Sequence, residues 1–245
     1  GEITAIAEGI ATISAQTVSG GFTATCVATV IAVPEYVDLG LPSGIKWASF
    51  NLCETGLANS PEDYGDYFAW GEVAPKSDYS WSTYVWCAGS SSTLSKYNTD
   101  SSYGSVDNKT TLESEDDAAS VILGDNWRMP TNEEWSELID NCTKTWTSQN
   151  GVEGLLVVGP NGNSVFLPAA GYGDDLIIDE VSSNGSYWSS SLATSPPSAC
   201  DVIFSFRYDA NNFNDNRYYG QSVRPVYDDR IHPTSIELNK ISLSL

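Results

Sequence analysis

The chain has 245 residues, of which 41% are hydrophobic and 11% aromatic, so it can bury a substantial core and wholesale disorder is not expected. It carries 11 Lys and Arg residues against 32 Asp and Glu residues, a formal net charge of −21. A field of that sign repels nucleic-acid phosphates and anionic lipids, so we expect no nucleic-acid partner. No run of about 18 apolar residues occurs, so we also expect no membrane insertion.

Cysteine and histidine usage argues against a zinc site. The five cysteines include no CxxC pair, and the single histidine is His232. We expect small buried thiols, or at most one disulfide, since an odd count leaves one cysteine unpaired. The sequence contains no signal peptide, and we expect that targeting information was removed from a longer chain.

Residues 2–33 predict β-strands. Apolar and polar residues alternate at 11–15 and again at 22–28, and a period of two gives a strand one buried face. Ser19-Gly20-Gly21 supplies a turn between these runs, which predicts a hairpin. Three strands in about 30 residues are too few for an independent core, so another segment must complete this sheet.

Two short helices are expected after the boundary at Pro34. Residues 115–123 begin with acidic side chains that favour the positive end of the helix dipole, and this helix ends at Gly124. The second helix begins after Thr131, the N-cap, with Glu134 as its reciprocal partner in a capping box. One apolar stripe follows along this helix. It consists of Trp135, Leu138, Ile139 and Cys142.

Short strands and turns dominate after residue 150. Residues 154–171 predict a hairpin around Pro160-Asn161-Gly162, and residues 185–191, 201–209 and 221–228 predict three further strands. Helices early and strands late predict an α+β domain with two short helices and many short strands.

The two ends of the chain resemble one module. Residues 3–30 resemble the second half of a group-2 bacterial immunoglobulin-like domain, and PTSIELNKISLSL (233–245) resembles its first strand. We therefore expect a small partial β-sandwich from the N-terminal strands and, as one alternative, the C-terminal strand. Residues 232–245 could also add to a neighbouring molecule by strand exchange, because backbone groups pair regardless of side chains.

Four ordered signatures lie between these ends: VDLGLPSGIKWAS (37–49), DYGDYFAWGE (63–72), NWRMPTNEEWSEL (126–138) and YWSSS…RYYGQSVRPV (187–226). Together they resemble a family of secreted domains of gut Bacteroidetes and Fibrobacter, related to the formylglycine-generating-enzyme type of C-type-lectin fold. The resemblance covers residues 36–228. It implies a domain organisation of 1–34 (partial immunoglobulin-like), 35–229 (C-type-lectin-like) and 230–245 (immunoglobulin-like strand).

The resembling superfamily contains enzymes and binders, and the cysteines favour a binder. A formylglycine-generating oxidase needs a reactive cysteine pair in the C-terminal third, where this chain has only Cys200. We therefore expect a non-catalytic ligand-binding or adhesin module, extracellular or on the cell surface, with a protein or glycan ligand. A fimbrial or other structural surface subunit and a degenerate enzyme remain the alternatives.

The expected ligand surface is SFRYDANNFNDNRYYG (205–220). In variable proteins of the C-type-lectin fold the last strands and loops display the ligand surface, and adenine-directed mutagenesis enriches Asn, Tyr, Asp, Ser and Phe. Tyr and Phe give contact area at low entropic cost, and Asn adds adaptable hydrogen bonds. The alternative is a solvated polar loop with its aromatic rings turned inward. The candidate residues are Ser190, Arg207, Tyr208, Asp209, Asn211, Asn212, Phe213, Asn214, Asn216, Arg217, Tyr218 and Tyr219.

Other candidates are given structural roles. Arg128 and Arg224 are expected to tie loops to carbonyls or carboxylates rather than to capture anions. Core positions are expected for Trp47, Trp70, Trp127, Trp135 and Trp188, in preference to a sugar-stacking platform.

Carboxylates cluster at residues 63–72, 115–117 and 174–180 and offer the oxygen ligands that calcium prefers. The Glu-Pro-Asn and Trp-Asn-Asp patterns of calcium-dependent lectins are absent. We expect no cofactor, with a structural calcium ion as an open alternative. Chance carboxylate pairs are numerous, so they do not by themselves indicate glycoside hydrolysis.

Overall fold

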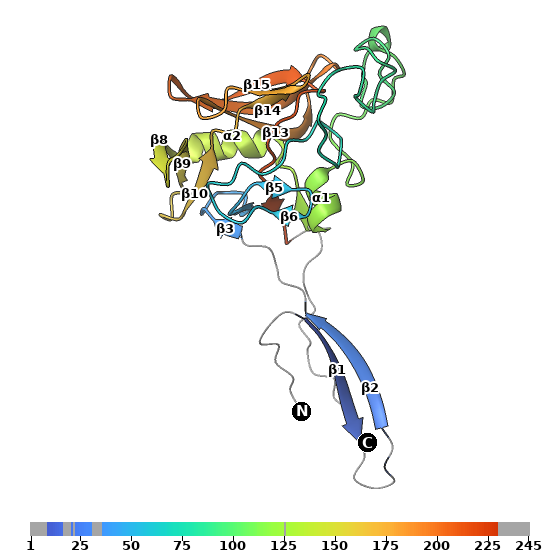
Figure 1. The fold of residues 1–245 in the computed structure, drawn as a ribbon, viewed down its shortest axis with the longest axis vertical. Coiled ribbons are helices and arrows are strands. Elements are labelled where there is room, and N and C mark those ends of the chain that lie inside the picture. Colours follow the sequence, from blue (N-terminus) through green and yellow to red (C-terminus); the bar gives the residue numbers. More distant parts are fainter. Residues whose placement is uncertain (1–8, 17–20, 22, 31–35, 125, 230–245) are drawn as a thin grey trace. The chain divides into compact units, whose positions relative to one another are not determined.

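A computed structural model describes residues 9–16, 21, 23–30, 36–124 and 126–229 (Figure 1). The chain divides between residues 34 and 35 into two compact units. The predicted C-terminal strand, its exchange with another molecule, and His232 lie outside the described residues. No described helix is long and apolar enough to cross a membrane.

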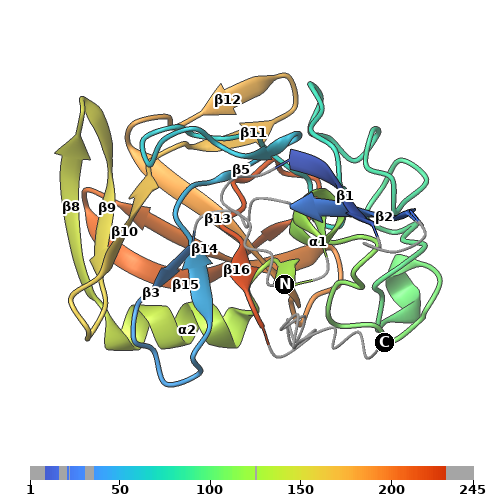
Figure 2. The same ribbon diagram turned by 90° about the horizontal axis from the view of Figure 1, so that it is seen from below.

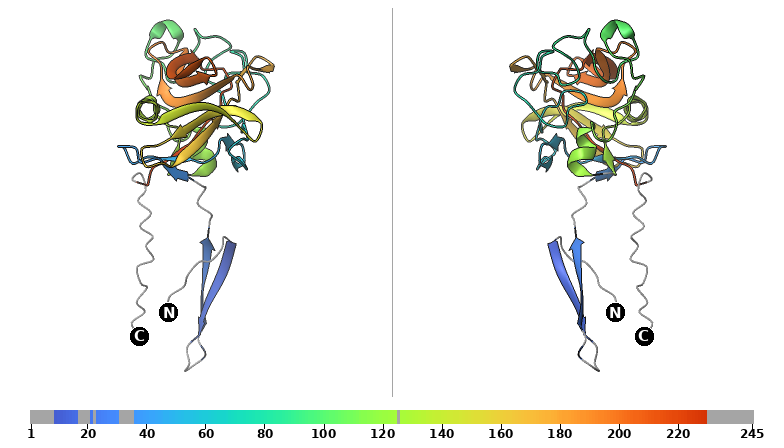
Figure 3. Two further views of the ribbon diagram at one scale, coloured as in Figure 1. Left: turned by 90° about the vertical axis from the view of Figure 1, so that its left-hand side faces the viewer. Right: turned by 90° about the vertical axis from the view of Figure 1, so that its right-hand side faces the viewer.

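The first unit contains the predicted hairpin. Strands β1 (Gly9–Gln16) and β2 (Thr23–Val30) pair antiparallel, and they run side by side in both views of Figure 3. Gly21 has φ 68°, a conformation that glycine adopts without steric cost. Thr12, Ser14 and Val27 are exposed as the alternation predicts, but Ala24, which was expected on the buried face, is exposed too.

The two helices of the second unit begin at capping residues. Helix α1 (Ala118–Leu123) starts later than predicted because Asp117 is its N-cap and accepts hydrogen bonds from the backbone N–H groups of Ala119 and Ser120. The expectation of acidic residues inside its first turn was therefore wrong. Helix α2 (Asn132–Asn141) has the predicted capping box: Thr131 accepts from the Glu134 N–H, and Glu134 accepts from the Thr131 N–H at 2.9 Å.

Small antiparallel sheets supply most of the remaining regular structure of this unit, and together with the two helices they confirm an α+β fold. One sheet has the strand order β3 (Tyr36–Asp38), β4 (Lys46–Ala48), β16 (Val226–Tyr227), β7 (Trp127–Arg128). The other strands and the 3-10 helix are β5 (Leu52–Cys53), β6 (Gly56–Leu57), η1 (Ser101–Tyr103), β8 (Thr143–Gln149), β9 (Val152–Val158), β10 (Ser164–Pro168), β11 (Tyr172–Asp174), β12 (Ile177–Asp179), β13 (Asn184–Leu192), β14 (Ser198–Ser205) and β15 (Tyr208–Asn216).

The predicted strands after residue 150 are partly right. The hairpin β9–β10 and strand β13 are confirmed. Residues 201–209 are not one strand, because β14 ends at Ser205 and the chain turns at Phe206 and Arg207 before β15. Of residues 221–228 only Val226 and Tyr227 are in a strand.

The core lies on both sides of the sheet β13–β14–β15. Helix α2 runs across one face of this sheet and packs Trp135 and Leu138 against Val202 and Phe204 (Figures 1 and 2). All five tryptophans that were expected in the core are buried. They are Trp47, Trp70, Trp127, Trp135 and Trp188.

Both arginines of the signature motifs have structural partners. Arg128 makes two hydrogen bonds to the Glu134 carboxylate, at 2.5 and 2.6 Å. Arg224 is buried and donates to Asn51 and to the carbonyl oxygens of Ala48, Ser49 and Phe166. Arg224 thus ties the start of the unit to β10 and to the segment before β16.

Candidate functional site

The candidate ligand surface is the hairpin of β14 and β15. The two strands pair antiparallel from Ser198↔Asn216 to Ser205↔Tyr208. Three large aromatic side chains of this hairpin are exposed: Phe206 by 57%, Tyr208 by 45% and Phe213 by 44%. The inward-turned alternative is therefore wrong for these three residues.

Alternation along β15 places its residues on two faces. Val202, Phe204 and Ala210 are buried in the core on the α2 side. Asn212, the cross-strand partner of Val202, shares that side, and its amide donates to the Ser136 hydroxyl of α2 at 2.8 Å. Phe213 pairs with Asp201 and therefore points to the opposite face.

Neighbouring strands hold the turn of this hairpin in place. The Arg207 guanidinium lies 5.0 Å from the centre of the Phe206 ring, and that ring lies 6.3 Å from the Trp146 ring of β8. Asp209 forms a 3.8 Å ion pair with Lys144, also on β8. The turn thus presents its aromatic rings from a supported position.

Two predicted ligand residues are buried and offer no surface to a ligand. Arg217 donates to the Tyr84 hydroxyl and to the carbonyl oxygens of Tyr97, Pro196 and Lys96. Ser190 is 3% exposed, and its backbone N–H, at 2.8 Å, and its hydroxyl, at 3.4 Å, both donate to the Pro130 carbonyl. Both predictions are corrected because each side chain joins distant segments inside the core.

Three further predicted residues, Asn216, Tyr218 and Tyr219, are half-buried at the far end of β15. Tyr218 packs on Trp81 at 5.0 Å and on Tyr219 at 4.7 Å between ring centres. The predicted residues therefore divide into an exposed set and a half-buried or buried set. We call the exposed residues the hairpin face, a name that covers the turn and both sides of β15. They are Phe206, which was not among the candidates, and Arg207, Tyr208, Asp209, Asn211, Asn212, Phe213 and Asn214.

Two carboxyl groups that the sequence did not single out meet next to this hairpin. Gln221 donates its side-chain N–H to Asp201 at 3.0 Å and to Asp215 at 3.2 Å. Burial and the nearby Asp215 raise the pKa of Asp201 well above its ordinary value. Burial also raises the pKa of Asp215. One oxygen of Asp201 and the side-chain oxygen of Gln221 are buried without a hydrogen-bond partner.

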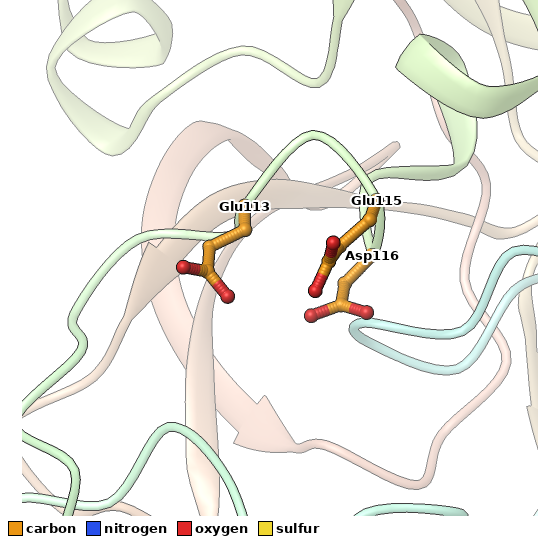
Figure 4. Close-up of side chains that lie close together, drawn as sticks. All are labelled: Glu113, Glu115 and Asp116. Carbon is orange, nitrogen blue, oxygen red and sulfur yellow. The ribbon is translucent and has the colours of Figure 1, made fainter.

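The carboxylate cluster before α1 contains a lysine, and it differs from the predicted residues 115–117 because Glu113 belongs to it whereas Asp117 caps α1. Figure 4 shows the carboxyl groups of Glu113, Glu115 and Asp116 close together. The Lys96 ammonium lies 2.8 Å from Glu113 and 3.3 Å from Glu115, and it also pairs with Asp116. A cation at this cluster would compete with that ammonium.

The four cysteines between residues 36 and 229 are free thiols. Cys53, Cys87, Cys142 and Cys200 form no disulfide. Burial, with smaller contributions from Asp201 and Glu133, raises the pKa of Cys200 to about 11. This thiol stays protonated near neutral pH, which disfavours it as a nucleophile or a metal ligand.

No family model, curated protein or solved structure matches this chain. The exposed residues of the hairpin face and the four sequence signatures are therefore the features that point to a function.

Proposed function

We propose that residues 35–229 form a C-type-lectin-like, non-catalytic ligand-binding domain of a secreted or cell-surface protein. The hairpin face contacts an extracellular protein or glycan, as in an adhesin. The observation that carries this proposal is the exposure of Phe206, Tyr208 and Phe213 on one hairpin, which packs on α2 through Val202, Phe204 and Ala210. Exposed aromatic side chains on a rigid support bind partners with little loss of conformational entropy.

The contacts among the four signatures support the proposed lectin-like fold. The first and last signatures pair through Trp47 and Val226, and the third joins them through Arg128, which pairs with Val226. Phe68 of the second signature bridges Gln221 of the last. Motifs from four parts of the sequence thus form one framework, as a shared fold requires.

The Asp201–Asp215 pair gives little support to the enzyme alternative. Asp201 is completely buried, and Phe213 is its cross-strand neighbour. A substrate would have to displace part of the hairpin to reach it. Together with the protonated thiol of Cys200, this burial favours binding over catalysis.

A structural subunit is the second candidate, and exposed apolar residues beside β12 favour it. Leu176 is 76% and Ile177 60% exposed, next to a cavity of about 340 Å³ lined by Tyr67, Lys76 and Tyr79. Exposed apolar runs beside strand edges are common sites of association. Size-exclusion chromatography with light scattering on Leu176→Asp, and on a chain lacking residues 232–245, tests this: a shift from oligomer to monomer supports the subunit.

The binding proposal is tested with the variant Phe206→Ala/Tyr208→Ala/Phe213→Ala on protein and glycan arrays. We expect binding to fall at least about tenfold, since exposed aromatic residues dominate such contacts. The midpoint of thermal unfolding should change little because all three side chains are exposed. Val85→Ala/Val121→Ala, at exposed apolar positions elsewhere, is the matched control. Unchanged binding by the triple variant would remove the hairpin face as the site.

A further inference from the structure

Asp201, Asp215 and Gln221 form a buried polar group. Among the described residues, no lysine, arginine or histidine contacts its two carboxyl groups. Asp201 and Gln221 are completely buried, and Asp215 is half-buried. The two carboxyl groups lie within hydrogen-bonding reach of each other, and among the described residues the Gln221 amide is the one side chain that donates to both. Two charged carboxylates in a buried site with one neutral donor are costly, so near neutral pH the pair either keeps a proton, as the raised pKa of Asp201 indicates, or holds a cation in its place.

Gln221 adds an oxygen to this group. Its Oε1 and the Oδ1 atom of Asp201 are both buried and have no hydrogen-bond partner. The Gln221 Nε2 atom lies 3.0 Å from one carboxyl oxygen and 3.2 Å from the other. Rotation by 180° about the last side-chain bond would put Oε1 at the place of Nε2, 3.0 Å and 3.2 Å from the two carboxyl oxygens, which is close to the spacing of neighbouring oxygen ligands around a cation with bonds of about 2.4 Å.

We propose that Asp201, Asp215 and Gln221 bind a divalent hard cation, with Ca²⁺ as the occupant. Two carboxylates and an amide oxygen are ligands that calcium prefers. The half-buried Asp215 gives an entry route and lets water supply the remaining ligands. The cation joins β14, β15 and the segment that carries Gln221, and it thereby stabilises the hairpin.

This site differs from the carboxylate cluster before α1. There the Lys96 ammonium already pairs with all three carboxylates, whereas lysine and arginine are absent from the contacts of Asp201 and Asp215. The site also does not depend on the proposed ligand, because none of its three residues belongs to the hairpin face.

The test measures thermal unfolding of the full chain in EDTA and in Ca²⁺ at matched ionic strength. Ca²⁺ should raise the unfolding midpoint of the parent protein by roughly 5 °C at saturation. Asp201→Asn/Asp215→Asn should lose this rise and, because it removes the like-charge repulsion, should unfold in EDTA at or above the parent midpoint. Glu113→Gln/Glu115→Gln should keep the rise. Asp215→Asn, at the half-buried position, repeats the test with a smaller change to the core.

Terbium gives a second measurement. Trp188 is the cross-strand neighbour of Asp201, so excitation of tryptophan should sensitise Tb³⁺ bound at the site. Calcium should displace this signal, and Asp215→Asn should lose it. The proposal is wrong if Ca²⁺ leaves the unfolding midpoint of the parent protein unchanged. It is also wrong if Ca²⁺ still raises the midpoint of Asp201→Asn/Asp215→Asn, or if the rise is lost in Glu113→Gln/Glu115→Gln.

Discussion

Arg217 and Arg224 are buried guanidinium groups whose hydrogen-bond acceptors are neutral oxygens. Arg217 also lies 4.9 Å from the centre of the Trp70 ring. Burial lowers the pKa of Arg224 to about 10, so the group stays charged at neutral pH. Each guanidinium satisfies several backbone carbonyls that come from distant parts of the chain, and removing it leaves those carbonyls buried without donors.

Arg217 and Arg207 should therefore respond very differently to mutation. We expect Arg217→Ala to lower the free energy of unfolding by about 3 kcal/mol or more, since several buried acceptors lose their donor. Arg207→Ala removes an exposed side chain and should change it by less than about 0.5 kcal/mol. Urea denaturation measures both values. Equal effects would contradict the division of the predicted ligand residues into exposed and buried sets.

Asp117 gives a pH dependence with a definite sign. Complete burial raises the pKa of its carboxyl group to about 6, although backbone N–H groups of Met129, Ser120 and Ala119 favour the charged form. The unfolded chain has a carboxyl pKa of about 3.9. Between about pH 4 and pH 6, Asp117 is therefore protonated in the folded protein and ionised in the unfolded chain. Its contribution to the free energy of unfolding is lost as the pH rises through that range.

The difference in unfolding free energy between the parent protein and Asp117→Asn isolates this contribution. As the pH rises from about 4 to about 7, the parent protein should lose about 2 to 3 kcal/mol of unfolding free energy relative to Asp117→Asn. Chemical denaturation at several pH values measures the slope. A difference that stays constant, or that moves in favour of the parent as the pH rises, would show that Asp117 is charged throughout.

At the scale of elements, helix α2 depends on its N-terminal cap. Thr131 and Glu134 satisfy each other's backbone N–H groups, and Arg128 holds the Glu134 carboxylate. Thr131→Ala should lower the free energy of unfolding by about 1 kcal/mol. Ser136→Ala, within the same helix, is the control and should cost less. Thermal or urea unfolding decides between them.

The sequence predicts α2 but not the Asp201–Asp215 pair, and the reason is the range of the interactions. A capping box needs residues three apart, and the apolar stripe from Trp135 to Cys142 repeats with the helix period, so both are visible locally. The pair depends on the register of β14 against β15, which the turn at Phe206 and Arg207 sets. The sequence pattern predicts one strand over residues 201–209, so it does not reveal that turn.

The hairpin face, too, could be predicted from the sequence only in part. Composition indicated a binding surface at residues 205–220, and Phe206, Tyr208 and Phe213 are indeed exposed. Composition does not say which side of a strand faces the core, so the segment included Arg217. The candidates also included Ser190 on β13, and the burial of both residues depends on contacts with residues far along the chain.

At the scale of the whole molecule, the net charge of −21 opposes compaction. Screening should relieve this repulsion, so raising NaCl from about 20 mM to about 200 mM should raise the midpoint of thermal unfolding. KCl should act equally, because the effect depends on ionic strength rather than on a bound ion. A midpoint that falls with salt would show that the ion pairs outweigh the repulsion.

The sheet β3–β4–β16–β7 brings the first and last described strands of the larger unit together. The rings of Tyr36 and Tyr227 stack with centres 4.8 Å apart, and Lys46 pairs with Asp229 at 2.8 Å. Mechanical tension that enters at Tyr36 and leaves at Asp229 would pass through this short sheet and bypass β14 and β15. A pull on these two ends would therefore have to separate the Tyr36–Tyr227 stack and the Lys46–Asp229 ion pair before it reached the hairpin.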